Sequence, residues 1–190
     1  MGEMQKANMS GTVTDTGNPF TDGINAAQRE IAAGDRTVNI YLDIDGVLIR
    51  NGKPTPNCFA FLRWAVANHT PYWLTTRDPH GSHDGILRAF RLAMGAATLP
   101  TGIETLLTAI RPTRWRTNKV SAIDVSSDFV WLEDQPLPTE IELLRSLGLL
   151  DRLIIINSDD DLLSYMAGRA ASRFQASDVA LGKASFAQDR

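Results

Sequence analysis

Two aspartates one residue apart, followed by a glycine, are the residues of this chain best placed to do chemistry. Asp43 and Asp45 come directly after the apolar run at residues 38–42, and Gly46 follows them. Two carboxylates held this close repel each other unless a cation lies between them or one of them carries a proton. One carboxylate can then act as a nucleophile and the other as a general acid and base, with a divalent cation to offset their charge.

A second predicted strand, at residues 72–74, ends in two hydroxyls and a guanidinium. These are the side chains of Thr75, Thr76 and Arg77. Threonines at strand ends often only cap a turn. The planar fork of Arg77, however, suits a phosphate group, so this strand end is a candidate binding site.

A third predicted strand, at residues 128–132, ends in the acidic pair Glu133 and Asp134. Both side chains offer the hard oxygen ligands that Mg²⁺ and Ca²⁺ take in proteins. Open α/β sheets bind their ligands at the carboxyl ends of the strands. Two acidic strand ends, separated by a strand that ends in threonine, therefore favour one shared site over unrelated turns.

The order of the predicted elements indicates an α/β fold. Strands and helices alternate, which is typical of a mostly parallel sheet with right-handed crossovers and three layers, α/β/α. The run at residues 38–42 predicts a strand buried on both faces, and Gly46 permits the turn after it. We also expect a short edge strand at residues 96–99. Apolar residues at helical spacing predict helices within residues 58–67, 85–94, 101–110 and 138–147, and a last buried strand at 152–157.

The strand ends at Asp43, Thr75 and Glu133 resemble motifs of the haloacid dehalogenase-like (HAD) phosphatases and phosphotransferases. The resemblance covers roughly residues 38–166. The acidic pair is Glu-Asp, where Asp-Asp is more usual in the family. The resemblance implies a Rossmann-like sheet with the Asp43 strand at its centre and the strands of Thr75 and Glu133 on either side.

The family's third motif is a Lys or Arg at the start of a helix, and Lys119 matches it. Lys119 ends the basic cluster of residues 111–119 and precedes a helix that Thr117 or Asn118 would open; Arg114 and Arg116 are the alternatives. Trp115 in the same cluster suits either base stacking or packing in the core, and packing is the plainer interpretation.

The resemblance also implies a role for each matching residue. Asp43 would attack phosphorus and form an aspartyl-phosphate, and Asp45 would protonate the leaving oxygen and later activate water. Thr75, with Thr76 as the competing candidate, and Lys119 would hold the phosphoryl oxygens.

Mg²⁺ is the cofactor implied. Its ligands would be Asp43, the carbonyl oxygen of Asp45 and Asp134, with Glu133 helping directly or through a water molecule. The residues expected to contact the substrate are Gly46, Thr76 and Arg77.

The gaps between the motifs leave little room for the cap domain that many HAD proteins carry. One predicted helix lies in the first gap and about two lie in the second. We therefore expect a minimally capped, Mg²⁺-dependent phosphatase with an open active site. The alternatives are a phosphatase acting on nucleic-acid ends and a non-catalytic regulatory or binding domain. The residues around the three strand ends are also similar to the motifs of a small bacterial HAD subgroup. Some members of this subgroup are associated with RNA repair.

Composition limits the class of protein further. The chain has 190 residues, a net charge of −3 and a single cysteine, Cys58. The charge gives no general attraction to nucleic acid or to anionic membrane, and one cysteine allows no internal disulfide. With no apolar run long enough for a membrane span and no signal peptide, we expect a cytoplasmic protein. We expect a flexible leader at residues 1–20, one domain at 21–175 that begins with a helix at 25–33, and a frayed tail at 176–190.

Two polar clusters outside the motifs raise the question of further metal sites. His80 and His83 lie three residues apart, but no other His or Cys nearby completes a zinc site. Three aspartates at residues 159–161 precede an apolar helical segment. Acidic residues at a helix N-terminus are the plainer explanation for them.

Overall fold

The computed structural model describes residues 37–169, all of which belong to one compact unit. The leader predicted at residues 1–20, the helix predicted at 25–33 and the tail predicted at 176–190 lie outside these residues. None of the described helices is long and apolar enough to cross a membrane.

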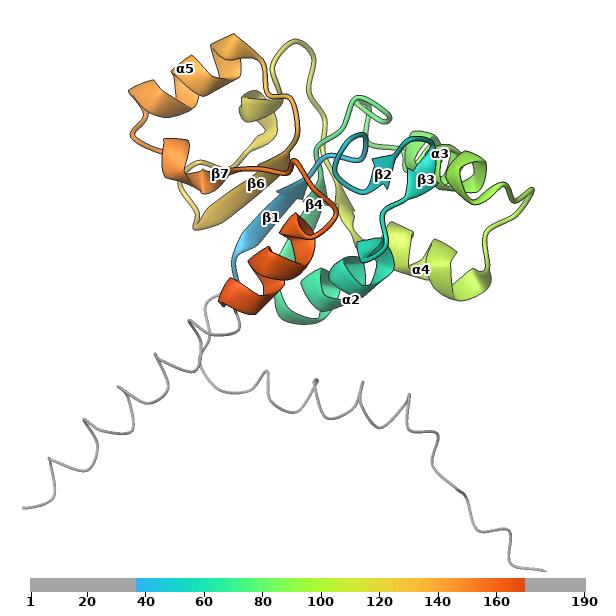
Figure 1. The fold of residues 1–190 in the computed structure, drawn as a ribbon. Coiled ribbons are helices and arrows are strands. Elements are labelled where there is room, and N and C mark those ends of the chain that lie inside the picture. The colour runs from blue at the N-terminus through green and yellow to red at the C-terminus, as the bar shows by residue number, and fades with distance from the viewer. Residues whose placement is uncertain (1–36, 170–190) are drawn as a thin grey trace, which may run out of the picture. The chain divides into compact units, whose positions relative to one another are not determined.

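A five-stranded parallel sheet forms the centre of the described structure (Figure 1). Its strand order is β5-β4-β1-β6-β7, and every neighbouring pair is parallel. The prediction that the Asp43 strand lies between the strands of Thr75 and Glu133 is therefore confirmed. The strands are β1 (Asn39–Leu42), β4 (Thr70–Trp73), β5 (Arg111–Pro112), β6 (Phe129–Glu133) and β7 (Leu153–Ile155).

Alternating side chains of β1 enter two separate cores, one on each face of the sheet. Ile40 and Leu42 belong to the larger core, whereas Tyr41 belongs to the smaller one. β6 divides in the same way, with Leu132 in the larger core and Trp131 in the smaller. Because both faces are covered, the central strands are continuous apolar runs rather than alternating ones.

Helices cover each face of the sheet and complete a three-layer α/β arrangement (Figure 1). Side chains of four helical segments pack in the larger core: α2 (Cys58–Asn68), α3 (Asp84–Met94), α4 (Thr101–Ala109) and residues 161–169. Cys58 is fully buried here, and burial raises the pKa of its thiol to about 12. The smaller core is covered by η1 (Lys119–Ala122), α5 (Pro138–Ser146) and η2 (Leu150–Arg152).

Three elements differ from the sequence prediction. The last strand, expected to be buried at residues 152–157, is the three-residue edge strand β7, and Ile155 in it is exposed because no further strand covers that edge among the described residues. No strand forms at residues 96–99; the edge strand is β5 instead. Pro112 has no N–H to donate, and an edge strand is where a sheet tolerates it. The helix expected to follow Asn118 is only the 3₁₀ turn η1, although Asn118 opens it as predicted by accepting a hydrogen bond from the Val120 N–H at 2.8 Å.

A close approach between Gly85 and Arg77 fixes the loop that follows β4. Gly85 is the second residue of α3, and a Cβ atom there would lie 1.8 Å from the Arg77 carbonyl oxygen. Asp78 holds the same loop, because its buried carboxylate accepts hydrogen bonds from the His83 N–H at 2.5 Å and the Ser82 hydroxyl at 3.2 Å. The backbone of Arg77 is therefore held in place before any ligand binds.

Gly85→Ala should destabilise the fold, because backbone rather than a flexible side chain blocks the added methyl group. We expect a loss of about 1–3 kcal/mol in the free energy of unfolding, measured by urea denaturation. Gly102→Ala is the matched control. Gly102 is also the second residue of a helix, but nothing lies within 4 Å of its added Cβ. This control should be neutral or stabilising by about 0.5–1 kcal/mol. Equal effects of the two changes would contradict the prediction.

Candidate functional site

Three neighbouring strands deliver Asp43, Thr75 and Glu133 to the same edge of the sheet. Backbone hydrogen bonds continue past the strand ends, from the Asp43 N–H to the Leu132 carbonyl at 3.1 Å and from the Leu74 N–H to the Leu42 carbonyl at 2.8 Å. The exposed fractions of Asp43, Thr75 and Glu133 are only 4%, 1% and 2%. These three side chains thus lie on rigid sheet backbone and are largely screened from water.

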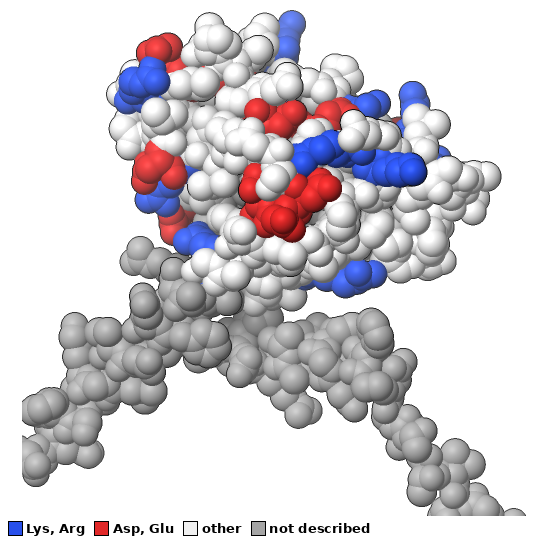
Figure 2. Space-filling model, viewed as in Figure 1, with Lys and Arg blue, Asp and Glu red and all other residues white. Residues whose placement is uncertain are grey.

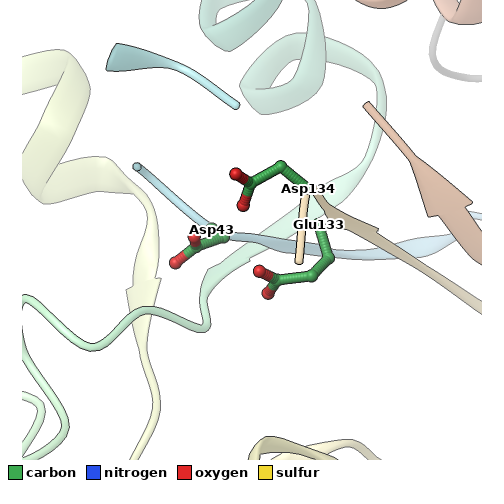
Figure 3. Close-up of side chains that lie close together, drawn as sticks. All are labelled: Asp43, Glu133 and Asp134. Carbon is green, nitrogen blue, oxygen red and sulfur yellow. The ribbon is translucent and has the colours of Figure 1, made fainter. Parts of the chain in front are cut away.

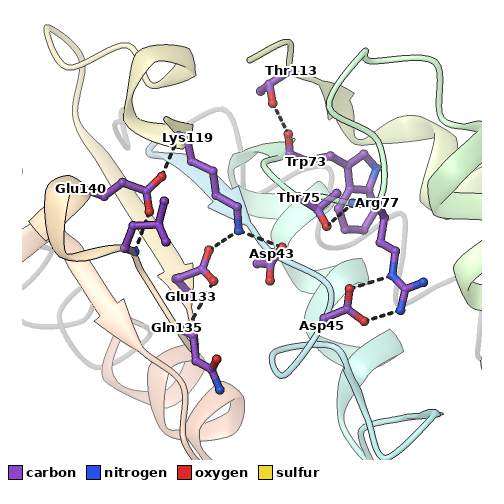
Figure 4. A network of polar contacts seen from close by, with 11 residues as sticks. Asp43, Asp45, Trp73, Thr75, Arg77, Thr113, Lys119, Glu133, Gln135 and Glu140 are labelled. Carbon is purple, nitrogen blue, oxygen red and sulfur yellow. Dashed lines mark hydrogen bonds and ion pairs between the residues drawn. The ribbon is translucent and has the colours of Figure 1, made fainter. Parts of the chain in front are cut away.

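Lys119 lies between the two buried carboxylates (Figure 4). Its Nζ is 2.6 Å from Glu133 Oε2 and 3.2 Å from Asp43 Oδ1. The contact with Glu133 is a hydrogen bond, whereas Asp43 Oδ1 has no hydrogen-bond partner of good geometry in the described chain. This buried oxygen is therefore held by the charge of Lys119 without a well-aligned hydrogen bond.

Glu140 is the site residue that sequence reasoning missed. It is 2% exposed, and its carboxylate accepts hydrogen bonds from the Lys119 N–H at 2.7 Å and the Leu137 N–H at 2.9 Å. It thereby joins the start of η1 to the loop between β6 and α5. A glutamate three residues after a helix N-cap is a known capping signal, but the distant contact with Lys119 has no signature in the sequence.

Burial and mutual repulsion set the ionisation of the two carboxylates. Burial raises the pKa of Glu133 to about 7, and the Asp43 charge adds to this rise while Lys119 opposes it. Burial also raises the pKa of Asp43, against the opposing effects of Lys119 and the Thr75 hydroxyl. Burial alone would lower the pKa of Lys119, but Asp43 and Glu133 outweigh it and the pKa is raised. One ammonium thus does not fully compensate two buried carboxylates.

Asp134 adds a third carboxylate and completes a group that can hold a metal ion. Asp43, Glu133 and Asp134 each offer an oxygen within 4.8 Å of the others, and the three side chains lie close together (Figure 3). If all three carboxylates are ionised, the single charge of Lys119 leaves two negative charges uncompensated. A divalent cation that prefers oxygen ligands fits both this charge and the carboxylate oxygens gathered there. Lys119 forms a hydrogen bond with the Glu133 carboxylate. Asp134 is therefore the more available metal ligand of the acidic pair.

Gly46 is required where the turn after β1 passes Asp134. Its φ is +73°, and an added Cβ would lie 1.9 Å from Asp134 Oδ2. The Gly46 carbonyl also accepts a hydrogen bond from Arg50 Nη2 at 2.6 Å. Arg50 belongs to the hairpin that follows this turn, formed by β2 (Ile49–Arg50) and β3 (Lys53–Pro54). Gly46 therefore lies against the candidate metal site as part of its wall.

Asp45 and Arg77 form an ion pair at the outer side of the site (Figure 4). Arg77 Nε and Nη2 each donate a hydrogen bond of 2.7 Å to the two oxygens of Asp45. The Asp45 carboxylate is not part of the three-carboxylate group, and the metal role expected for its carbonyl oxygen stays a prediction. Of the two threonines, Thr75 is buried and its hydroxyl accepts a hydrogen bond from the Arg77 N–H at 3.2 Å, whereas Thr76 is exposed.

The clusters outside the motifs have structural explanations. His83 Nε2 lies 2.8 Å from the Ile110 carbonyl oxygen, so this ring contributes to packing between loops. Asp161 accepts hydrogen bonds from the Asn157 and Ser158 N–H groups ahead of the helix at residues 161–169. Within residues 37–169, the group of Asp43, Glu133 and Asp134 is the one candidate set of metal ligands.

The basic cluster of residues 111–119 separates in the fold. Lys119 enters the site, whereas Trp115 packs against the smaller core, in keeping with the packing role favoured for it. The guanidinium of Arg111 lies over the Tyr72 ring, 5.6 Å from its centre. Arg114 and Arg116 are exposed.

Comparisons of the chain with family models, with curated proteins and with solved structures found no match. The arrangement of side chains at the sheet edge is accordingly the basis for the function proposed below.

Gly46→Ala should displace Asp134 and weaken metal binding. We expect Mg²⁺ affinity to fall by about tenfold or more, measured by isothermal titration calorimetry. Gly52→Ala is the matched control, because Gly52 has nearly the same φ, +71°, but nothing within 4 Å of its added Cβ. The control carries similar backbone strain and should keep its Mg²⁺ affinity. Unchanged affinity in Gly46→Ala would argue against Asp134 as a ligand.

The metal-free protein should lose stability as the pH rises from about 4.5 to about 7. The pKa of Glu133 is about 7 when folded, against an ordinary value of 4.5, so folding favours the protonated form. The stabilisation is complete below the ordinary pKa and is lost as the pH passes the folded pKa. Its size is at most on the order of 3 kcal/mol.

Thermal unfolding in EDTA between pH 4.5 and 8 measures this effect against Glu133→Gln. The variant should show a shallower fall in Tm. Mg²⁺ should raise the Tm of the unmodified protein more at pH 8 than at pH 5, because its ligands must be ionised. A pH dependence identical in the two proteins would refute the assignment to Glu133.

Proposed function

We propose that this chain is a Mg²⁺-dependent phosphatase of the HAD type, with an open active site and an aspartyl-phosphate intermediate. The observation that carries the proposal is the meeting of four motif residues at one sheet edge. Asp43, Thr75 and Glu133 arrive there on neighbouring parallel strands, and Lys119 Nζ lies 3.2 Å from Asp43 Oδ1 and 2.6 Å from Glu133 Oε2. A nucleophile, a cation and acidic metal ligands thus share one site.

The elements between the motif strands support a minimally capped enzyme. Between β1 and β4 lie only the β2–β3 hairpin and α2, and between β4 and η1 lie α3, α4 and the edge strand β5. All of these belong to the same compact unit as the sheet. Access to the site is therefore set by loops, chiefly the hairpin and the loop that carries Arg77.

The first half of the reaction transfers the phosphoryl group to Asp43. An oxygen of the ionised Asp43 carboxylate attacks phosphorus and the bond from phosphorus to the leaving oxygen breaks. Asp45, which has taken up a proton from solvent, gives that proton to the leaving oxygen. Lys119 favours the ionised form of Asp43 by its nearby positive charge. Mg²⁺, held by Asp43 and Asp134, would supply a positive charge that offsets the repulsion between the carboxylate and the phosphate.

The second half regenerates the enzyme. Asp45, now ionised, takes a proton from a water molecule whose oxygen attacks phosphorus. The bond between phosphorus and Asp43 breaks, and inorganic phosphate leaves. The Thr75 hydroxyl and the Lys119 ammonium hold the phosphoryl oxygens in both halves, and burial keeps other water away from Asp43.

A small phosphomonoester is the substrate class that the surface favours. The face seen in Figure 2 has acidic and basic side chains side by side rather than one continuous basic area. The basic cluster of residues 111–119 is not available as a whole, since Lys119 is buried and Trp115 packs in the smaller core. A phosphorylated nucleic-acid end and a non-catalytic role are the alternatives that the experiment below separates.

Phosphate release should depend on both Mg²⁺ and Asp43. We would assay an aryl phosphate, nucleotides, sugar phosphates and 3′- or 5′-phosphorylated oligonucleotides with Mg²⁺ and with EDTA. Asp43→Asn should lower kcat at least about a thousandfold, because it removes the nucleophile. Asp151→Asn, an exposed residue before β7, is the matched control and should keep full activity.

Each other result has a definite meaning. Turnover that survives in Asp43→Asn would refute the mechanism. Faster release from oligonucleotides than from small esters would favour the nucleic-acid alternative. No phosphate release from any of these substrates, in a protein that still binds Mg²⁺, would favour the non-catalytic role.

A further inference from the structure

The ion pair between Asp45 and Arg77 engages the carboxylate that the proposed reaction needs as its general acid and base. Both Asp45 oxygens accept a hydrogen bond of 2.7 Å from Arg77. A general acid and base must present one carboxylate oxygen to the leaving group and later to water. In the observed arrangement both oxygens face the guanidinium instead. The pair must therefore open, and Asp45 must take up a proton from solvent, before Asp45 can act as the general acid.

The pair is half exposed, so it can open without leaving either charge buried. The two side chains are 46% and 43% exposed, and water that replaces the two hydrogen bonds offsets part of the cost of breaking this bidentate contact. The backbone around Arg77 cannot move as easily, because Gly85 lies against the Arg77 carbonyl and Asp78 holds the loop. Opening thus amounts to a rotation of one long side chain on a fixed backbone.

A phosphoryl group is the natural competitor for Arg77. The planar guanidinium fork binds two phosphate oxygens in the way it binds two carboxylate oxygens. Arg77 is also close to where such a group would lie: its N–H donates to the Thr75 hydroxyl at 3.2 Å, and the Asp43 charge contributes to raising its pKa, after the larger effect of Asp45. Nη1 has no hydrogen-bond partner among residues 37–169 and is free to make the first contact.

We propose that Arg77 binds the Asp45 carboxylate in the substrate-free enzyme. When substrate binds, its phosphoryl group forms hydrogen bonds with the Arg77 guanidinium in place of Asp45, and Asp45 is released. The inference rests on the proposed function and adds to it a control step built into the active site. Asp45 becomes available only when a phosphoryl group is bound. Arg77 is then both a phosphate ligand and the positioning residue of Asp45.

Binding of inorganic phosphate in the presence of Mg²⁺ tests this exchange without any catalysis. Isothermal titration calorimetry would compare the unmodified protein with Arg77→Gln, Asp45→Asn and the double variant. Arg77→Gln should weaken phosphate binding by about tenfold, as expected for a lost charge-assisted hydrogen bond. Arg116→Gln, an exposed arginine of the basic cluster, controls for the loss of one positive charge and should change the affinity little.

The decisive comparison is the effect of Asp45→Asn in the two backgrounds. Asp45→Asn removes the competitor for Arg77, so phosphate should bind more tightly when Arg77 is present. Part of this gain reflects only the lost negative charge, and the same change made in Arg77→Gln measures that part. We expect the gain to be about two- to fivefold larger when Arg77 is present.

Equal gains in the two backgrounds, or weaker binding in Asp45→Asn, would overturn the exchange. Failure of phosphate to bind the unmodified protein would overturn it as well. The Asp43→Asn activity assay reports on the proposed function separately, so a phosphatase without this exchange would be recognised as such.

Discussion

The buried contact of Lys119 with Asp43 and Glu133 is the interaction on which the rest of the site depends. Two carboxylates at adjacent strand ends, both nearly without exposure to water, would repel each other strongly if ionised. The Lys119 ammonium offsets part of this repulsion, and Glu140 fixes the backbone that carries it. The remaining negative charge, increased by Asp134, is what a divalent cation would offset in the proposed reaction.

The site combines a rigid half with an adaptable half. The hydrogen bonds of the sheet and close packing hold Asp43, Thr75 and Glu133 in place. These side chains are therefore already positioned before a reaction begins. Asp45 and Arg77 lie on loops and are half exposed. This division matches chemistry in which the nucleophile must be fixed, whereas the proton-transferring group must meet a leaving group and then a water molecule.

Sequence patterns predicted what is local and failed where distant residues decide. The buried runs before Asp43, Thr75 and Glu133 were sufficient to predict the strands, and the shared edge followed from parallel pairing. The edge strand at Arg111–Pro112 was missed because a proline in a basic cluster is not typical of a strand. These two residues form a strand only through their pairing with β4. Glu140 was missed because its local pattern is that of a helix cap. Lys119 was predicted as a site residue, but its contact with Glu133 depends on how η1 packs against β6.

The edges of the sheet bear on how this protein behaves at high concentration. An open sheet exposes unpaired backbone groups at its outer strands, and long flat edges invite other chains to add to them. Here one edge is β5, only two residues long and containing a proline and an arginine, and the other is β7, three residues long. Both edge strands are thus short, and the proline of β5 also lacks a backbone N–H donor. Each edge therefore offers little on which a further strand could pair. The strand before Asp43, β1, and the strand that ends in Glu133, β6, lie inside the sheet, where both of their edges are already paired.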